Sequence, residues 1–189
     1  MEYSINFITI YILLQLLLTL GAYFYYYSYV RKRYLKNKKL PFMVGFGQHL
    51  VFLLHALILY LPYFIYTGWP AIYTGKIQSV TGIICGSSGL IILFSGFINL
   101  GAYSKTIGIN PGKLKTKGLY RITRNPQAQG YFLFLVSFAL IWPSWYIILS
   151  LISFVIIIHR MILTEEIHLK NVFGEEYVEY SKRTSRYIF

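Results

Sequence analysis

The stretch INFITIYILLQLLLTLGAYFYYYSYV, residues 5–30, contains no Lys, Arg, His, Asp or Glu. A helix rises about 1.5 Å per residue, so roughly 20 such residues cross the ~30 Å hydrocarbon core of a bilayer. The stretch has no basic segment before it and no small-residue cleavage site after it, and more apolar runs follow, which argues against a signal peptide. We therefore predict a transmembrane helix over residues 5–30.

The composition extends this prediction to the whole chain. Hydrophobic residues make up 56% of the 189 residues and charged residues only 13%, which leaves too little polar surface for a soluble domain. We predict an all-α, polytopic membrane helical bundle that forms a single domain over residues 1–189, with about five transmembrane segments, a C-terminal helical hairpin and a helical tail. The predicted segments are residues 5–30, 46–66, 79–102, 128–142 and 145–160, with a loop at 103–127 and a tail at 161–189.

The fourth segment is short for a membrane helix. The apolar run Gly130–Trp142 would span only about 20 Å as a helix, less than the hydrocarbon thickness. Either its helix begins earlier, within Gln127–Gln129, or the hairpin does not cross the bilayer fully. We favour the earlier start.

The charges predict the orientation. The chain carries a formal net charge of +12, and the loops after the first and third segments hold six Lys or Arg each, whereas the loop between the second and third holds only Lys76. Basic residues concentrate on cytoplasmic loops. The N-terminus is therefore expected outside and the C-terminal tail in the cytoplasm, with Trp142 and Trp145 in an outer aromatic belt. The basic excess suits the anionic inner leaflet, not nucleic acid.

Polar side chains lie at membrane depth in the second segment. His55 either lines a cavity or forms a hydrogen bond between helices, and we favour the hydrogen bond. Gln48 and His49 lie near the inner interface, where an interfacial or capping role is expected. With a single cysteine, Cys85, and no carboxylate near the two histidines, no metal site is expected.

Glycines repeat along the third segment with small-xxx-small and seven-residue spacings. They allow close approach either of another helix or of a flat ligand, and helix packing is the more common use of such spacing. The glycines are Gly82, Gly86, Gly89 and Gly96.

Residues whose side chains could bind a ligand or take part in a reaction are concentrated in two polar stretches, Lys113–Gly130 and Arg160–Tyr180, which flank the predicted hairpin. Because the two ends of a hairpin lie side by side, both stretches should meet at the membrane surface and form a pocket for a zwitterionic, cationic or polar cofactor. Asn125 is expected to cap a helix that begins at Pro126, and a helix N-terminus favours a carboxylate. The residues that this brings together are Arg121, Arg124 and Asn125 on one side and Arg160, Glu165 and Glu166 on the other.

Both stretches carry an ordered motif. The first reads Gly-x-Tyr-Arg-x-x-Arg-Asn-Pro from Gly118, and the second Glu-Glu-x-x-Leu-x-x-x-Phe-Gly-x-x-Tyr-x-x-Tyr from Glu165. This pattern resembles the isoprenylcysteine carboxyl methyltransferase and phospholipid methyltransferase superfamily of membrane enzymes. The resemblance covers about Leu100 to Phe189. It departs from the usual Arg-His-Pro-x-Tyr of that superfamily in having Asn125 for the histidine and Ala128 for the tyrosine.

The resemblance implies transfer of a methyl group from S-adenosyl-L-methionine to a membrane lipid or lipidated substrate. It implies that Arg160 and Asn125 are the catalytic residues and that Arg160 faces the acceptor's polar group. Displacement at a sulfonium needs alignment and exclusion of water more than an acid–base triad, which fits the absence of one. By the same resemblance the cofactor would be held by Lys113, Leu114, Lys115, Tyr120, Arg124, Asn125, Pro126, Gln127, Ala128, Glu165 and Glu166.

Two other functions stay open at this point. A membrane reductase of the sterol-reductase type would share the helical arrangement, but it would need a nicotinamide site that the motifs do not suggest. A non-catalytic membrane protein with a decayed cofactor site would account for Asn125 and Ala128. The sequence does not select the acceptor or the oligomeric state.

Overall fold

The computed structural model describes residues 2–37, 39, 41–65, 75–100 and 112–188. Within them the chain is helical apart from turns, extended stretches and one isolated bridge. Parts of the predicted loops, residues 66–74 and 101–111, lie outside the described residues. The helices are α1 (Glu2–Phe24), η1 (Tyr25–Val30), α2 (Arg31–Lys36), α3 (Phe42–Ile65), α4 (Lys76–Leu100), η2 (Gly118–Arg121), α6 (Pro126–Ile141), α7 (Trp145–Phe173) and α8 (Glu175–Arg183).

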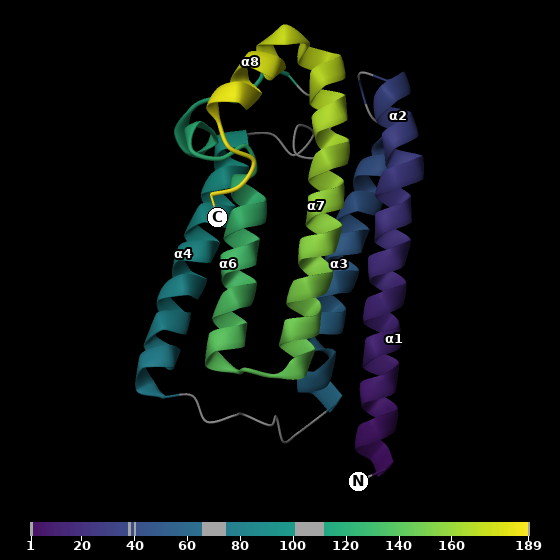
Figure 1. Cartoon of the computed structure of the whole chain (residues 1–189), viewed down its shortest axis with the longest axis vertical. Helices are drawn as coiled ribbons and strands as arrows, with labels where there is room; N and C mark the ends of the chain where they lie inside the picture. Colours follow the sequence, from purple (N-terminus) through teal and green to yellow (C-terminus); the bar gives the residue numbers. More distant parts are fainter. Residues whose placement is uncertain (1, 38, 40, 66–74, 101–111, 189) are drawn as a thin grey trace.

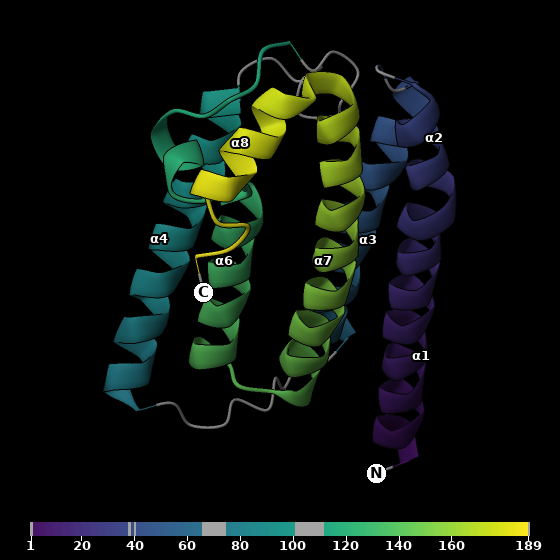
Figure 2. The same cartoon turned by 45° about the horizontal axis from the view of Figure 1, so that its top comes forward.

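Within the described residues, the long helices α1, α3, α4, α6 and α7 run side by side and make the bundle (Figure 1). α4 and α6 form an adjacent pair, α7 stands next to them, and α1 and α3 lie beyond α7. α8 crosses one end of the bundle in both views, and the N-terminus lies at the opposite end (Figure 2). The turn between α6 and α7 is also at the N-terminal end, where Ser144 caps α7 by accepting a hydrogen bond from the Ile147 amide (3.4 Å).

The bundle has the length and composition of a membrane protein. Four helical stretches are long and apolar enough to cross a bilayer: Asn6–Lys36, Phe42–Pro62, Lys76–Leu100 and Trp145–Phe173. α6 is a shorter apolar helix of 16 residues, about 24 Å. The predicted polytopic helical bundle is therefore confirmed, and so is the early start of the fourth segment, since α6 begins at Pro126.

Several predicted boundaries were too narrow. The first helix continues through a π-helical turn into α2, so that part of the basic loop is helical. α7 runs on from the predicted end at residue 160 to Phe173, because Arg160–Phe173 has no Gly or Pro and is rich in helix-forming Leu, Glu and Met. The helix ends at Gly174, whose φ of +55° suits glycine. α3 and α4 likewise begin three or four residues before the predicted segments.

The glycine face of α4 packs against α6. A Cβ on Gly89 would lie 2.7 Å from the carbonyl oxygen of Gly130, and a Cβ on Gly130 would overlap the backbone of Leu93. Gly96 is similarly close to Gln127. Helix packing is thus the observed use of these glycines, and the other possibility, a path for a flat ligand or lipid tail, is wrong because α6 fills the face.

Polar side chains join α7 to α1 and α3. Gln15 Nε2 donates to Ser150 Oγ (2.5 Å), which also lies 2.6 Å from the Tyr11 hydroxyl. His55, 1% exposed, has its Nε2 2.9 Å from the Ser150 carbonyl oxygen. The predicted interhelical hydrogen bond of His55 is confirmed, and these bonds satisfy polar groups that would otherwise face hydrocarbon.

Candidate functional site

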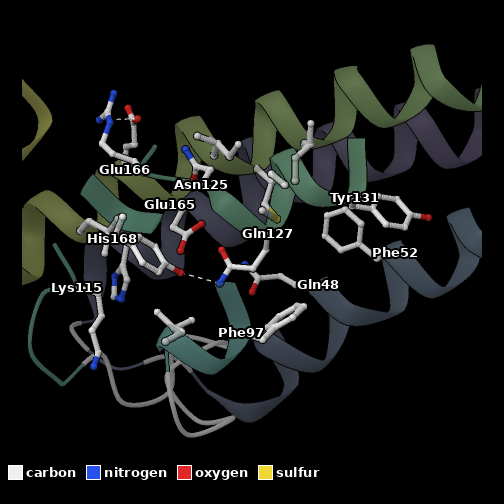
Figure 3. Close-up of a pocket in the computed structure, with 18 of the residues that line it drawn as sticks. Gln48, Phe52, Phe97, Lys115, Asn125, Gln127, Tyr131, Glu165, Glu166 and His168 are labelled. Atoms are coloured by element: carbon white, nitrogen blue, oxygen red, sulfur yellow. Dashed lines mark hydrogen bonds and ion pairs between the residues drawn. The ribbon is translucent and has the colours of Figure 1, made fainter. Parts of the chain in front are cut away.

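A pocket of about 480 Å³ lies at the α8 end of the bundle (Figure 3). It is walled by α2, α3, α4, α6, α7 and α8, by η2 and by the residues that lead into η2. This volume is within the range of small-molecule sites. Most of its surface is apolar, with Phe52, Phe97, Tyr131 and Phe154 among the walls.

The two polar stretches meet in this pocket, as the hairpin predicted. Pro126 is buried but does not line the pocket, and Arg160 is also absent from its walls. Of the residues predicted to hold a cofactor, the pocket is lined by Lys113, Leu114, Lys115, Tyr120, Arg124, Asn125, Gln127, Ala128, Glu165 and Glu166.

Tyr120 is fixed at the pocket wall by both its ends. Its hydroxyl accepts a hydrogen bond from Gln127 Nε2 (2.7 Å), and its carbonyl oxygen accepts one from the Tyr180 hydroxyl (2.7 Å). Burial raises the pKa of Tyr120 above its usual value, and it raises the pKa of Tyr180 to about 12. Both phenols are therefore neutral near pH 7, and the motif tyrosine of η2 is tied to the motif tyrosine of α8.

Glu166 is occupied by two arginines. Its carboxylate lies 2.9 Å from Arg124 Nη1 and accepts hydrogen bonds from Arg186 Nε (2.8 Å) and Nη2 (2.7 Å). The side chain is only 11% exposed. Arg124 also donates to the Tyr177 hydroxyl (3.1 Å). The predicted approach of Arg124 to Glu166 is confirmed, but the contact joins α7, α8 and the α6 turn to each other.

Asn125 holds the C-terminal segment instead of capping α6. Its Nδ2 donates to the Arg186 carbonyl oxygen (3.0 Å), and its side chain makes no cap hydrogen bond. The predicted cap is wrong: the side-chain amide of Asn125 binds the C-terminal segment instead of the start of α6. Ser185 and Arg186 run beside Thr123 and Arg124, where Arg124 N donates to Ser185 O (2.9 Å) and Thr123 Oγ1 donates to Arg186 O (3.0 Å). Pro126 is at the first turn of the helix, as predicted.

Glu165 has a different environment from its neighbour. It lines the pocket, and within the described part of the chain it makes no ion pair or hydrogen bond. Figure 3 shows Glu165 between Gln127 and His168, while Glu166 points away from it. A carboxylate that is largely withdrawn from water and unpaired suits a cationic or hydrogen-bond-donating ligand.

Arg160 faces away from the pocket. Its guanidinium lies over the Tyr27 ring (4.5 Å to the centroid) and near the Tyr23 ring (5.4 Å), both on the α1 side of α7. Arg160 therefore does not line the pocket with Glu165, and its role toward the acceptor's polar group stays a prediction. On a helix, residues five positions apart point in different directions, which hairpin adjacency alone ignores.

The N-terminal half supplies pocket residues that the sequence analysis did not assign. Tyr34, Gln48 and His49 line the pocket, as does His168 on α7. His168 follows Glu165 by three positions and so shares its helix face, a signal that the sequence does contain. Tyr34 and Gln48 have no comparable signal, because only the packing of α2 and α3 against α7 brings them there.

The sequence that forms most of this pocket is similar to that of a known protein family. A family model described as phospholipid methyltransferase matches residues 77–176, just over half of the chain. The chain belongs to the phospholipid methyltransferase family. The match runs from α4 into α8 and includes the first polar stretch of this family member and the second as far as Glu176, whereas α1, α2 and α3 lie outside it. No curated protein and no solved structure matches the chain significantly.

Proposed function

We propose that this member of the phospholipid methyltransferase family is an S-adenosyl-L-methionine-dependent methyltransferase that acts on a lipid or lipidated acceptor at the cytoplasmic membrane face. The observation that carries the proposal is that one pocket joins the two family motifs to an apolar wall. A lipid methyltransferase needs a polar cofactor and an apolar acceptor in contact, and a pocket with both kinds of surface suits that need.

The residues present fit the cofactor. Glu165 is a carboxylate without a described partner and would take the amino group, the ribose hydroxyls or the sulfonium. Lys113 and Lys115 would take the carboxylate, and the buried aromatic Tyr120 offers a wall for the adenine. When bound, S-adenosyl-L-methionine supplies an activated methyl group. The protein's own task is to orient it and to exclude water.

Two residues that were predicted to contact the cofactor are instead bound to another part of the protein. Glu166 and Asn125 line the pocket but are engaged with Arg186. We propose that both act by holding the C-terminal segment and α6 in place, so that Gln127 and Ala128 keep their positions at the wall. Arg160 is left out of the proposed site because its guanidinium packs on tyrosines of the first helix.

An acceptor could reach the pocket from the bilayer between α3 and α4. Both helices line the pocket, but within the described residues they make almost no direct contact with each other. Leu53 on α3 is 55% exposed and Phe97 on α4 is 39% exposed, and both belong to the pocket wall. Apolar side chains that face both a pocket and the lipid suit the passage of an acyl or prenyl chain.

The proposed orientation places this pocket in the cytoplasmic leaflet. α2 and residues 112–117, which lead into η2, carry basic residues and lie at the α8 end with the pocket (Figure 1). The opposite end holds the α6–α7 turn with Trp142 and Trp145, which are 42% and 78% exposed. The positive-inside rule assigns the first end to the cytoplasm.

The decisive experiment is calorimetric binding of S-adenosyl-L-methionine and of NADPH to detergent-purified protein. We expect binding of the methyl donor and its loss in Glu165→Ala. Binding of NADPH alone would favour a reductase, and binding of neither would favour a decayed site. Lipid extracts incubated with donor labelled at the methyl group would then identify the acceptor.

A further inference from the structure

His168 is a buried imidazole without a good partner. It is 3% exposed, and neither ring nitrogen makes a hydrogen bond of acceptable geometry with a described residue. The Tyr34 carbonyl oxygen, which accepts a hydrogen bond from Asn171 Nδ2 (3.0 Å), is the acceptor nearest to the ring and can engage at most the one ring N–H, so that the other ring nitrogen stays without a described partner. A buried polar group left unpaired costs about 1–3 kcal/mol, so such groups usually face water or a ligand. His168 lines the pocket, which gives it access to one.

The ring of His168 is held in place by the N-terminal half of the protein. It stacks on Tyr34, with ring centroids 4.3 Å apart and an interplanar angle of 21°. Gln48 Nε2 donates to the Tyr34 hydroxyl (3.0 Å). These three side chains come from α7, α2 and α3, and all three line the pocket. They form a polar wall built largely outside the region that the family model matches.

This wall continues into an apolar one along α3. Gln48, Phe52 and Ala56 follow one another at four-residue intervals on one helix face, and all line the pocket. The face therefore changes from polar near α2 to apolar one turn further into the bundle. A ligand that matches it has a polar head and an apolar tail.

Two groups that line this part of the pocket can accept a hydrogen bond from a ligand, the His168 ring, which also carries one N–H donor, and the Glu165 carboxylate. A neutral imidazole has one acceptor nitrogen, and the Glu165 carboxylate accepts only. Because Glu165 is the proposed partner of the cofactor, the acceptor nitrogen of His168 is the one left for a headgroup that carries N–H or O–H donors. A quaternary ammonium group has no such donor and would leave that nitrogen without a hydrogen bond.

We propose that His168 is a specificity-determining residue of the acceptor subsite, where its free nitrogen accepts a hydrogen bond from the donor-bearing headgroup of an amphipathic lipid. Tyr34 and Gln48 orient the ring, and the α3 face of Phe52 and Ala56 takes the start of the tail. The proposal rests on the proposed function for the identity of the ligand as an acceptor, but it is tested by binding alone.

The test compares lysophosphatidylethanolamine with lysophosphatidylcholine of the same acyl chain, bound to detergent-purified full-length protein and measured by native mass spectrometry. The two probes differ in having N–H donors or none. We expect the unsubstituted protein to bind the ethanolamine lipid roughly threefold to tenfold more tightly, the size of one hydrogen bond. His168→Phe keeps a ring to stack on Tyr34 and should remove the preference, and His168→Asn should restore part of it.

His159→Phe is the matched control, since His159 is an exposed α7 histidine that contacts Tyr187 outside the pocket. It should keep the preference. If His168→Phe does not fold, His168→Leu removes the same nitrogens in a smaller side chain. Equal affinity for both lipids in the unsubstituted protein, or a preference that survives loss of the His168 nitrogens, would overturn the proposal. Failure to bind S-adenosyl-L-methionine would instead defeat the proposed function and leave the lipid preference measurable.

Discussion

Glu165 and Glu166 are consecutive on α7, yet only Glu166 is paired: two arginines hold it, while Glu165 faces the pocket without a described partner. Neighbours on a helix point about 100° apart, so one carboxylate can hold the fold while the other faces a ligand. Substitution of Glu166 should therefore lower the stability of the protein, and substitution of Glu165 should lower its affinity for the ligand.

Glu166→Gln should destabilise the protein and Glu165→Gln should not. Removing the charge that holds Arg124 and Arg186 leaves two cations without a carboxylate, at a cost of about 2–3 kcal/mol, below the ~3–5 of a fully buried pair because Arg186 is one-third exposed. Thermal unfolding in detergent measures this. Glu165→Gln should keep its unfolding temperature and lose cofactor affinity in calorimetry, and equal loss of stability in both variants would contradict the assignment.

Gly89→Ala should weaken the α4–α6 contact. The new methyl group would meet the backbone of α6 at Gly130 and Phe134, which cannot move as a side chain can, and overpacking of this kind costs about 1–3 kcal/mol. Gly21→Ala on α1 is the control, since a Cβ there meets nothing within 4 Å. Thermal unfolding should show a loss for Gly89→Ala and none for Gly21→Ala.

Arg160→Met should affect stability slightly and cofactor binding not at all. The cation–π contacts with Tyr23 and Tyr27 are worth about 1 kcal/mol together with packing. Arg160→Lys, which keeps a cation, should recover part of the stability. A loss of cofactor affinity or of methyl transfer in Arg160→Met, with a folded protein, would return Arg160 to the reaction site.

High pH should loosen α8. Burial raises the pKa of Tyr180 from 10 to about 12, so the unfolded chain releases this proton at lower pH than the folded protein does. The contribution of neutral Tyr180 to the free energy of unfolding is fully present below pH 10 and is lost as the pH rises to about 12. Each unit of difference between the two pKa values corresponds to at most about 1.4 kcal/mol. Unfolding measured between pH 9 and 12 should be less pH-dependent in Tyr180→Phe than in the unsubstituted protein.

Local patterns predicted the parts of this protein that local physics determines. Apolar runs longer than the bilayer thickness identified the long helices, and Pro126 marked the start of α6. The hairpin turn at Pro143 and Ser144 was enough to bring the two polar stretches into one pocket. The family motifs predicted the pocket residues between Lys113 and Ala128 and the pair Glu165 and Glu166, because those residues lie close to the hairpin in sequence, but not the apolar walls that α6 and α7 supply.

Contacts between distant segments were not predictable in the same way. Arg160 and Glu165 lie near each other in sequence but face different neighbours, and the direction depends on how α1 packs on α7. Asn125 has the sequence of a cap, but an extended segment some sixty residues later takes its amide. Tyr34 and Gln48 enter the pocket only through the packing of α2 and α3.

The short α6–α7 turn lies at the end of the bundle opposite the pocket (Figure 1). α4 packs along α6, while α1 and α3 pack on α7, so the turn joins two blocks of helices that meet along α6 and α7. Because this short turn fixes the separation of α6 and α7 at one end, a small rotation between the two blocks would change their separation most at the other end, where the pocket lies. At that end the carboxylate of Glu166 on α7 is bound by Arg124, which precedes α6, and by Arg186. We therefore expect the pocket to widen only when these ion pairs open, so that the pair of blocks has one fixed end and one end held by charge.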